Sequence, residues 1–232
     1  MERRKFTSGL FSAVGLGSVG LATLAHAADM VTERDAAMGV RAALERGAVA
    51  AVGLLGRPGG FLDNPKVRIP LPGFLNETAK VLKYTGQHKR VDELVTAMNR
   101  AAEAAVPQAK TLLINAVKAM SVEDGKQILT GGDNSVTNFF AGKTRAPLAL
   151  TFLPIVTKAT EKVALADKYN AVAGKAAGLG LLKQEDANIQ QYVTAKALDG
   201  LYLMIGEEER KIRRDPVGTG SAILQKVFGS LK

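Results

Sequence analysis

The chain has 232 residues, a formal net charge of +9 at pH 7 and 47% hydrophobic residues, enough for one domain with a sizeable core. It contains no cysteine, which excludes a disulfide framework, a thiolate metal site, a cysteine nucleophile and a lipid-modified N-terminal cysteine. Aromatic residues make up only 5%, so the core must consist mainly of Ala, Leu, Val and Ile. Because alanine and leucine favour helix and few segments alternate as strands do, we expect an all-α protein.

Residues 1–27 are predicted to be a cleaved export signal and are left out of the fold. Three basic residues at 3–5 precede a mildly apolar segment at 6–24, and Ala25 and Ala27 supply the small residues of a signal-peptidase site. A membrane anchor or a folded first helix is the alternative, which the glycines of this segment weaken. No later stretch has about 18 uninterrupted apolar residues, so we expect no second membrane span.

The sequence RRKF at 3–6 resembles the core of twin-arginine signals, whose export route carries folded cargo. Glu2 and Thr7 depart from the usual pattern, so the twin-arginine route and the general secretory route both stay open. Either route predicts a bacterial protein of the periplasm.

A first helix is predicted over 33–55, with Thr32 as its cap, and the glycine-rich stretch at 56–60 ends it. The next segment, 61–72, contains three prolines, which cannot continue a helix and which push their predecessors towards extended backbone. It is too apolar for a free linker, and we expect it to pack against the helices. In the alternative hypothesis the loop forms a binding lip, whose lysine and arginine at positions 66 and 68 face an anionic ligand.

The stretch LLGRPGGFLDNPKVRIPLPGFL, which contains this loop, resembles the signature of the domain of unknown function 4197 family. Three later stretches resemble that family's other landmarks: VDELVTAMNRAAEAAVPQAK, ILTGGDNSVTNFF and YVTAKALDGLYLMIGEEERKIR. They follow in the same order and cover nearly all of the mature chain. The resemblance implies a helical exported bacterial protein, and it carries over no activity, ligand or catalytic residue.

Helices are next predicted over 74–84 and from 91 to 120. Pro107 interrupts the second pattern, either as a kink, which we favour, or as the turn of a hairpin. The sequence SVED at 121–124 resembles a capping box with aspartate at its fourth place, and it predicts a short helix to residue 129.

After a turn, Asp133 or Ser135 is expected to cap a helix over 136–143. A separate helix is predicted from about 148 to 163, with one proline near its start and a second proline kinking it. Another helix is expected over 167–177, ended by two glycines.

The longest predicted helix, 186–214, is apolar almost all round between 197 and 205, which predicts a helix in the middle of a bundle. Pro216 stops it, and a short amphipathic tail follows at 221–231. The sequence therefore predicts a single all-α domain at 28–232, a multi-helix bundle of about eight to ten helices with the proline-rich apolar loop packed on it.

Two clusters of polar residues are candidate sites. Lys196 and Asp199 share a face of the longest helix, where they form either a structural buried pair or, with Tyr192 and Tyr202, a polar pocket inside the bundle. A candidate anion site is formed by backbone N–H groups before a helix and by nearby cations, although Asp133 is the competing cap. Its residues are Gly131, Gly132, Lys143 and Arg145.

We expect no metal site. The three glutamates at 207–209 point in different directions around a helix and are expected to pair at i,i+4, as Glu207 with Lys211 and Glu209 with Arg213. The mature chain has a single histidine, His88, whereas a carboxylate-bridged metal site in a bundle needs Glu-x-x-His pairs. The sequence contains no catalytic motif, and it predicts no cofactor.

The preferred hypothesis is a soluble periplasmic helical protein without enzymatic activity, which binds a partner or has a structural role in the envelope. An anionic envelope component or a protein is the expected partner, because the chain is basic. Nucleic acid is not expected, since export argues against it and no basic stripe is interleaved with aromatic residues. The rival hypothesis is an enzyme or small-molecule carrier that uses the polar pocket.

Overall fold

The computed structural model describes residues 33–73, 88–132, 134–180, 186, 188–215, 217, 218, 222 and 225. The chain divides into two units, Met1–Met30 and Val31–Lys232, and all of the described residues belong to the second. The predicted export signal, the helix expected at 74–84 and most of the tail at 221–231 lie outside the described residues. So do Thr32 and Asp133, two of the expected helix caps.

The described residues form helices and contain no strand, which confirms the all-α class. In chain order the elements are α1 (Glu33–Leu55), α3 (His88–Ala105), a 3-10 turn (Val106–Gln108), α4 (Ala109–Lys118), α5 (Val122–Thr130), α6 (Ser135–Thr160), α7 (Ala164–Gly178) and α8 (Ile189–Arg214). The expected total of eight to ten helices includes segments outside this part of the chain and stays a prediction. None of the helices so described is both long enough and apolar enough to cross a membrane.

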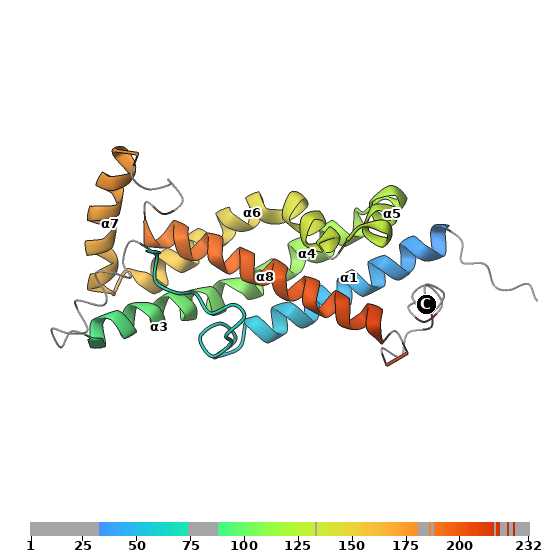
Figure 1. The fold of residues 1–232 in the computed structure, drawn as a ribbon, viewed down its shortest axis with the longest axis horizontal. Coiled ribbons are helices and arrows are strands. Elements are labelled where there is room, and N and C mark those ends of the chain that lie inside the picture. The colour runs from blue at the N-terminus through green and yellow to red at the C-terminus, as the bar shows by residue number, and fades with distance from the viewer. Residues whose placement is uncertain are drawn as a thin grey trace, which may run out of the picture. The chain divides into compact units, whose positions relative to one another are not determined.

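Helix α8 is the axis of the bundle. Its most extensive contacts are with α6 on one side and α1 on another, and α3 packs on α6 (Figure 1). Its middle is buried on nearly all sides, at Ala197, Leu198, Leu201, Tyr202, Met204 and Ile205. The prediction of a central buried helix is confirmed. The helix begins at Ile189 rather than at 186, because the Asn188 side chain accepts a hydrogen bond from the Gln191 N–H at 2.7 Å and caps it there.

The first helix has the predicted bounds, and glycines explain its end. Gly59 has a φ of 82°, in the left-handed region that favours glycine. A Cβ on Gly60 would lie 2.3 Å from the carbonyl oxygen of Leu55, so only glycine lets the chain turn back so closely over the last turn of α1.

Pro107 bends a continuous helical path instead of reversing it. The backbone stays right-handed helical at Ala105, Gln108 and Ala109, and only the three residues around the proline tighten into a 3-10 turn. The predicted kink is therefore confirmed against the hairpin. The capping box is also confirmed, since the Ser121 hydroxyl accepts from the Asp124 N–H at 3.0 Å and the Asp124 carboxylate accepts from the Ser121 N–H at 2.9 Å.

The expectation of two helices between 136 and 163 is wrong, because α6 runs unbroken through Pro147 and Pro154. Both prolines are exposed, so the carbonyls that they leave without an N–H partner lie on the outer side of the helix. The inner face buries a residue at every turn, at Phe140, Thr144, Leu148, Phe152 and Val156. Burial of that face outweighs an unfavourable term of about 3 kcal/mol per proline in a helix interior.

Ser135 is not the cap of α6. It is the first residue of the helix, and its hydroxyl donates to the Ile128 carbonyl of α5 at 3.1 Å. The N-cap position belongs to Asn134, which makes no side-chain capping bond. Helix α7 follows α6 and lies across one end of the bundle, where it contacts α3 and α8 (Figure 1).

Two glycine substitutions should have opposite effects on stability. A Cβ on Gly200 of α8 would lie 2.9 Å from Cε1 of Phe61 and 3.2 Å from Cβ of Val67, so Gly200→Ala should lower the free energy of unfolding by about 1–3 kcal/mol. Gly174 of α7 has open space around it, and Gly174→Ala should raise the free energy of unfolding by about 0.5–1 kcal/mol. Urea denaturation measures both. A neutral Gly200→Ala would contradict the close packing of loop and helix.

Candidate functional site

The most distinctive surface of the molecule is built by the segment at 56–72, here called the proline-rich loop. Its inner side is apolar and buried, at Phe61, Val67, Ile69 and Leu71. Two of these side chains, Phe61 and Val67, pack against Gly200 of α8, where the missing side chain leaves room for them. The loop therefore lies on the bundle as a part of its core, with a backbone that follows neither a helix nor a strand.

A buried loop without regular structure needs hydrogen-bond partners for its backbone, and α3 supplies them. The Glu103 carboxylate, 5% exposed, accepts from the N–H groups of Phe61 at 3.1 Å and Leu62 at 3.0 Å. Arg100, one turn before it, donates to the other oxygen at 2.6 Å. Desolvation is the largest single influence and raises the pKa of Glu103, but the hydrogen bonds from Leu62, Arg100, Phe61 and Gly59 together lower it below 4.5.

Asn99 lies one turn before Glu103 on α3, and it holds the second half of the loop. Its Oδ1 accepts from the Ile69 N–H at 2.8 Å and its Nδ2 donates to the Ile69 carbonyl at 3.0 Å. The side chain thus replaces the neighbouring strand that an extended residue would otherwise need. The Tyr192 hydroxyl of α8 donates to the carbonyl of Pro70 at 3.1 Å, which pairs the next residue as well.

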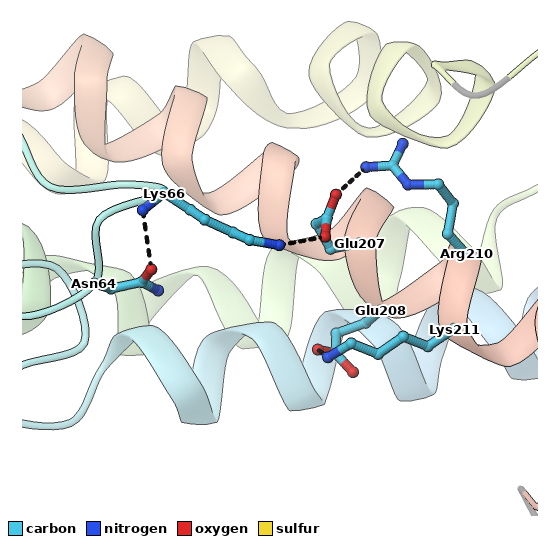
Figure 2. A network of polar contacts seen from close by, with 6 residues as sticks. All are labelled: Asn64, Lys66, Glu207, Glu208, Arg210 and Lys211. Atoms are coloured by element: carbon cyan, nitrogen blue, oxygen red, sulfur yellow. Dashed lines mark hydrogen bonds and ion pairs between the residues drawn. The ribbon is translucent and has the colours of Figure 1, made fainter.

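The outer side of the loop is charged and tied to the C-terminal part of α8. The Lys66 ammonium pairs with Glu207 at 2.7 Å, and its backbone N–H donates to the Asn64 side chain at 3.2 Å (Figure 2). Arg210 donates to the other carboxylate oxygen of Glu207. The hydrogen bonds from Lys66 and Arg210 lower the pKa of Glu207 to about 2.

The expected Glu207–Lys211 pair is wrong, because Lys211 pairs with Glu208 one turn before it (Figure 2). Glu207 instead points towards the loop and meets Lys66, a residue that is distant in sequence. The expected pair of Glu209 with Arg213 is confirmed, and Arg213 also donates to the carbonyl of Ile128 in α5 at 2.8 Å.

A cavity of about 430 Å³ opens on the outer side of the loop, and it is lined by Leu54, Arg57, Pro58, Gly59, Gly60, Asp63 and Asn64. Two side chains of opposite charge, Arg57 and Asp63, face it without a hydrogen bond or ion pair to any residue that the structure describes. Arg68 further along the loop is exposed and equally unpaired within that part of the chain. The loop thus combines a fixed backbone with charged groups that are available to a partner.

The four residues of the predicted polar pocket lie along one stripe of α8, and their polar ends do not converge. The Tyr192 hydroxyl is bonded to the loop, and the Tyr202 hydroxyl lies 3.0 Å from the Thr144 hydroxyl of α6. Lys196 and Asp199 form an ion pair at 3.8 Å with side chains 46% and 48% exposed, so the expected burial of this pair is corrected. The Lys196 ammonium also lies over the Tyr192 ring, 5.8 Å from the ring centroid.

The two cations of the predicted anion site separate onto two faces of α6. Arg145 pairs with Asp199 at 2.6 Å and lies 5.3 Å from the centroid of the Tyr202 ring, on the side facing α8. Lys143 lines a cleft on the side facing α5. Gly131 packs against Ser135, since a Cβ on Gly131 would lie 2.5 Å from that of Ser135, and Gly132 has open space around it. Residues two apart on a helix point away from each other, which explains the separation.

Sequence reasoning missed Asn99 and Glu103, the two residues that hold the loop. Both are polar and both lie among the buried, mostly apolar residues of α3, four residues apart and thus on one face. That spacing was a usable signal, because two buried polar residues next to a proline-rich apolar segment indicate backbone groups in need of partners. Among the described residues, no group of three or more His, Asp or Glu side chains could hold a metal ion.

Fold and site together define an all-α bundle that carries a surface loop whose backbone is held by side chains of α3. The chain matches the family described as "Protein of unknown function (DUF4197)" over residues 30–229, and it belongs to that family. The resemblance noted from the sequence is thereby confirmed. Neither a curated protein nor a solved structure matches the chain.

Removing the Asn99 side chain should destabilise the protein. Asn99→Ala leaves the buried N–H and C=O of Ile69 unpaired, and it should lower the free energy of unfolding by about 2–3 kcal/mol. Limited proteolysis should then cut within the loop before it cuts elsewhere. Asn115 on the exposed side of α4 is the control, and its change to alanine should alter stability by less than about 0.5 kcal/mol. Equal effects of the two substitutions on stability would contradict the role of Asn99 in holding the loop.

The ionisation of Glu207 should report the docking of the loop on α8. A carbon-detected NMR titration of its carboxyl group should give a pKa of about 2 in the wild type. Lys66→Met removes a hydrogen bond that favours the charged form, so the pKa should rise towards the ordinary value of 4.5. Lys211→Met is the control, because it removes an equal charge from α8, the helix that carries Glu207. It should leave the pKa of Glu207 unchanged, because Lys211 pairs with Glu208. A rise in the pKa of Glu207 in Lys211→Met but not in Lys66→Met would contradict this pairing and favour the Glu207–Lys211 pair instead.

Proposed function

We propose that the protein is exported to the periplasm and acts there, without enzymatic activity, as a binding protein that recognises an anionic group of an envelope component or protein through the outer side of the proline-rich loop. The observation that carries this proposal is the contrast between the two sides of the loop. Its inner side is held by Asn99, Glu103 and Tyr192, and its outer side presents Arg57 and Arg68 to solvent.

Rigidity of the loop supports a role in recognition. A surface whose backbone is already hydrogen-bonded loses little conformational entropy when a partner binds, so more of the interaction energy appears as affinity. The cations at 57 and 68 are free to bind, whereas Lys66 is already paired with Glu207 and serves the structure. The net charge of +9 falls to +7 once residues 1–27, with three basic residues and one acidic residue, are removed, and this basic character favours an anionic partner in addition.

The state of the polar side chains supports binding over the rival hypothesis of an enzyme or carrier. The hydroxyls of Tyr192 and Tyr202 form structural hydrogen bonds with the Pro70 carbonyl and the Thr144 hydroxyl. Burial, followed by the charge of Asp186 and the nearby Tyr169, raises the pKa of Tyr192 to about 12, so it remains protonated at neutral pH. Glu103 and Glu207 are held ionised by their partners. Groups committed in this way are poorly suited to transfer protons during a reaction.

Support for export comes from the first residues of the chain. The basic, apolar and small-residue regions of 1–27 follow the order of a secretory signal, and the family match begins at residue 30. Removal of the signal would leave a basic helical domain at 28–232 in the periplasm.

The proposal is tested by fractionating the source cells and then measuring binding to their isolated envelopes. Mass spectrometry of the periplasmic fraction should find a chain that begins at residue 28. In cosedimentation with the envelopes, Arg57→Gln/Arg68→Gln should bind about tenfold more weakly than the wild type, because two charged contacts are lost. Lys158→Gln/Lys168→Gln removes the same charge from α6 and α7 and is the matched control.

The outcomes separate the parts of the proposal. Retention of the chain in the cytoplasm would contradict export, and equal binding by both double variants would contradict recognition by the loop. Native mass spectrometry of the periplasmic protein adds a direct test of the rival hypothesis, since a retained small molecule released by Lys196→Met, with loop binding unchanged, would favour a pocket on α8.

A further inference from the structure

A second site lies away from the proline-rich loop, in a cleft of about 470 Å³ between α5 and α6. It is lined by Asp124, Gln127, Ile128, Ser135, Asn138, Phe139, Gly142 and Lys143. Its volume falls within the range of small-molecule sites, about 300–1,000 Å³. It shares no residue with the loop or with the stripe of tyrosines on α8, so nothing argued above accounts for it.

Two opposite charges face this cleft and do not meet. The Asp124 carboxylate is held by the capping box, because one oxygen, Oδ2, accepts from both the N–H and the hydroxyl of Ser121 at 2.9 Å. Lys143 acts on Asp124 through its charge, yet the two form no ion pair. The hydrogen bonds from Ser121 and, to a smaller extent, the charge of Lys143 lower the pKa of Asp124, which keeps the carboxylate ionised. Its second oxygen remains able to accept.

The rest of the lining contains both polar and apolar groups. The carboxamides of Gln127 and Asn138 make no hydrogen bond within the described part of the chain, so four donors and two acceptor oxygens are available there. The half-buried ring of Phe139, edge-on to Phe140 at 5.4 Å between centroids, forms the apolar side with Ile128. A separated charge pair, free amides and an aromatic ring thus surround one space.

We propose that this cleft binds a small zwitterion with an apolar side chain, an α-amino acid. Its carboxylate would pair with the Lys143 ammonium, its ammonium would pair with the free oxygen of Asp124, and its side chain would lie against Phe139. A neutral ligand would leave both charges unpaired, and an anion would lack a partner for Asp124. The same chemistry is offered by a free amino acid and, with the charges further apart, by the two ends of a short peptide.

Isothermal titration with L-leucine and with Leu-Leu tests the proposal and separates these two sources. Binding of L-leucine or L-phenylalanine with a Kd of about 1 mM or below is expected, and Leu-Leu should bind at least tenfold more weakly if the site takes the free amino acid. Two analogues probe the two charges separately: 4-methylpentanoate is leucine without the ammonium, and 3-methylbutylamine is leucine without the carboxylate. Each should lose at least tenfold in affinity relative to L-leucine. Tighter binding of Leu-Leu than of L-leucine would assign the site to peptide ends.

Lys143→Met removes one end of the site while the exposed position keeps its helix, and it should weaken L-leucine binding at least tenfold. Lys158→Met, on an exposed face of the same helix outside the cleft, should leave the affinity unchanged. The proposal is overturned if no apolar amino acid or dipeptide binds the wild-type protein, if 4-methylpentanoate binds as tightly as L-leucine, or if Lys143→Met binds L-leucine like the wild type. Envelope binding through the proline-rich loop is independent of all three results.

Discussion

The hydrogen bonds that Asn99 and Glu103 make to the backbone of the proline-rich loop are the constraint on which the rest of the surface depends. Prolines prevent this segment from forming its own helix, and an apolar segment cannot be buried while its N–H and C=O groups lack partners. Side chains one turn apart on α3 supply those partners. A buried carboxylate would itself be unfavourable, but the contact with Arg100 and three backbone donors offset its desolvation.

The burial of the loop determines what its inner side covers and which charges its outer side exposes. Phe61 and Val67 enter the space left by Gly200, so α8 is covered where it would otherwise expose its apolar middle. The groups that face inwards are paired, and the charges that remain face outwards. A similar division holds along the tyrosine stripe. The Tyr202 hydroxyl meets Thr144 of α6 and the Tyr192 hydroxyl meets the loop, while Arg145 and Lys196 lie over the two rings. Unpaired charges on a fixed scaffold are the physical basis of the proposed binding role.

Helix α6 illustrates how packing decides against local preference. The sequence predicted one helix to residue 143 and a second from about 148, with Pro147 near its start and Pro154 as a kink. The helix nevertheless continues without a break, because both prolines are exposed while the opposite side buries five residues. The Thr151 hydroxyl bonds the carbonyl of Pro147 at 2.9 Å and helps to satisfy that outer side. As a result, Lys143 and Arg145 lie on one continuous helix and face different partners. Lys143 lines the α5–α6 cleft and Arg145 pairs with Asp199, so the expected anion site is not assembled.

The sequence by itself determined the helical class, the bounds of α1, the central helix α8 and the capping box, because each follows from periodicity, propensity or hydrogen bonds between residues a few positions apart. Its motifs resembled the family that the match over residues 30–229 then confirmed, and at Pro107 it favoured a kink without excluding a hairpin. Tertiary structure decided the rest. Whether Lys196 and Asp199 were buried, whether Glu207 met Lys211 or Lys66, and which side chains anchored the loop all depended on contacts across 30 or more residues, or on which face of a helix was covered. Local patterns indicate which groups are able to pair, but the packing of one helix on another decides which of them lie close enough to do so.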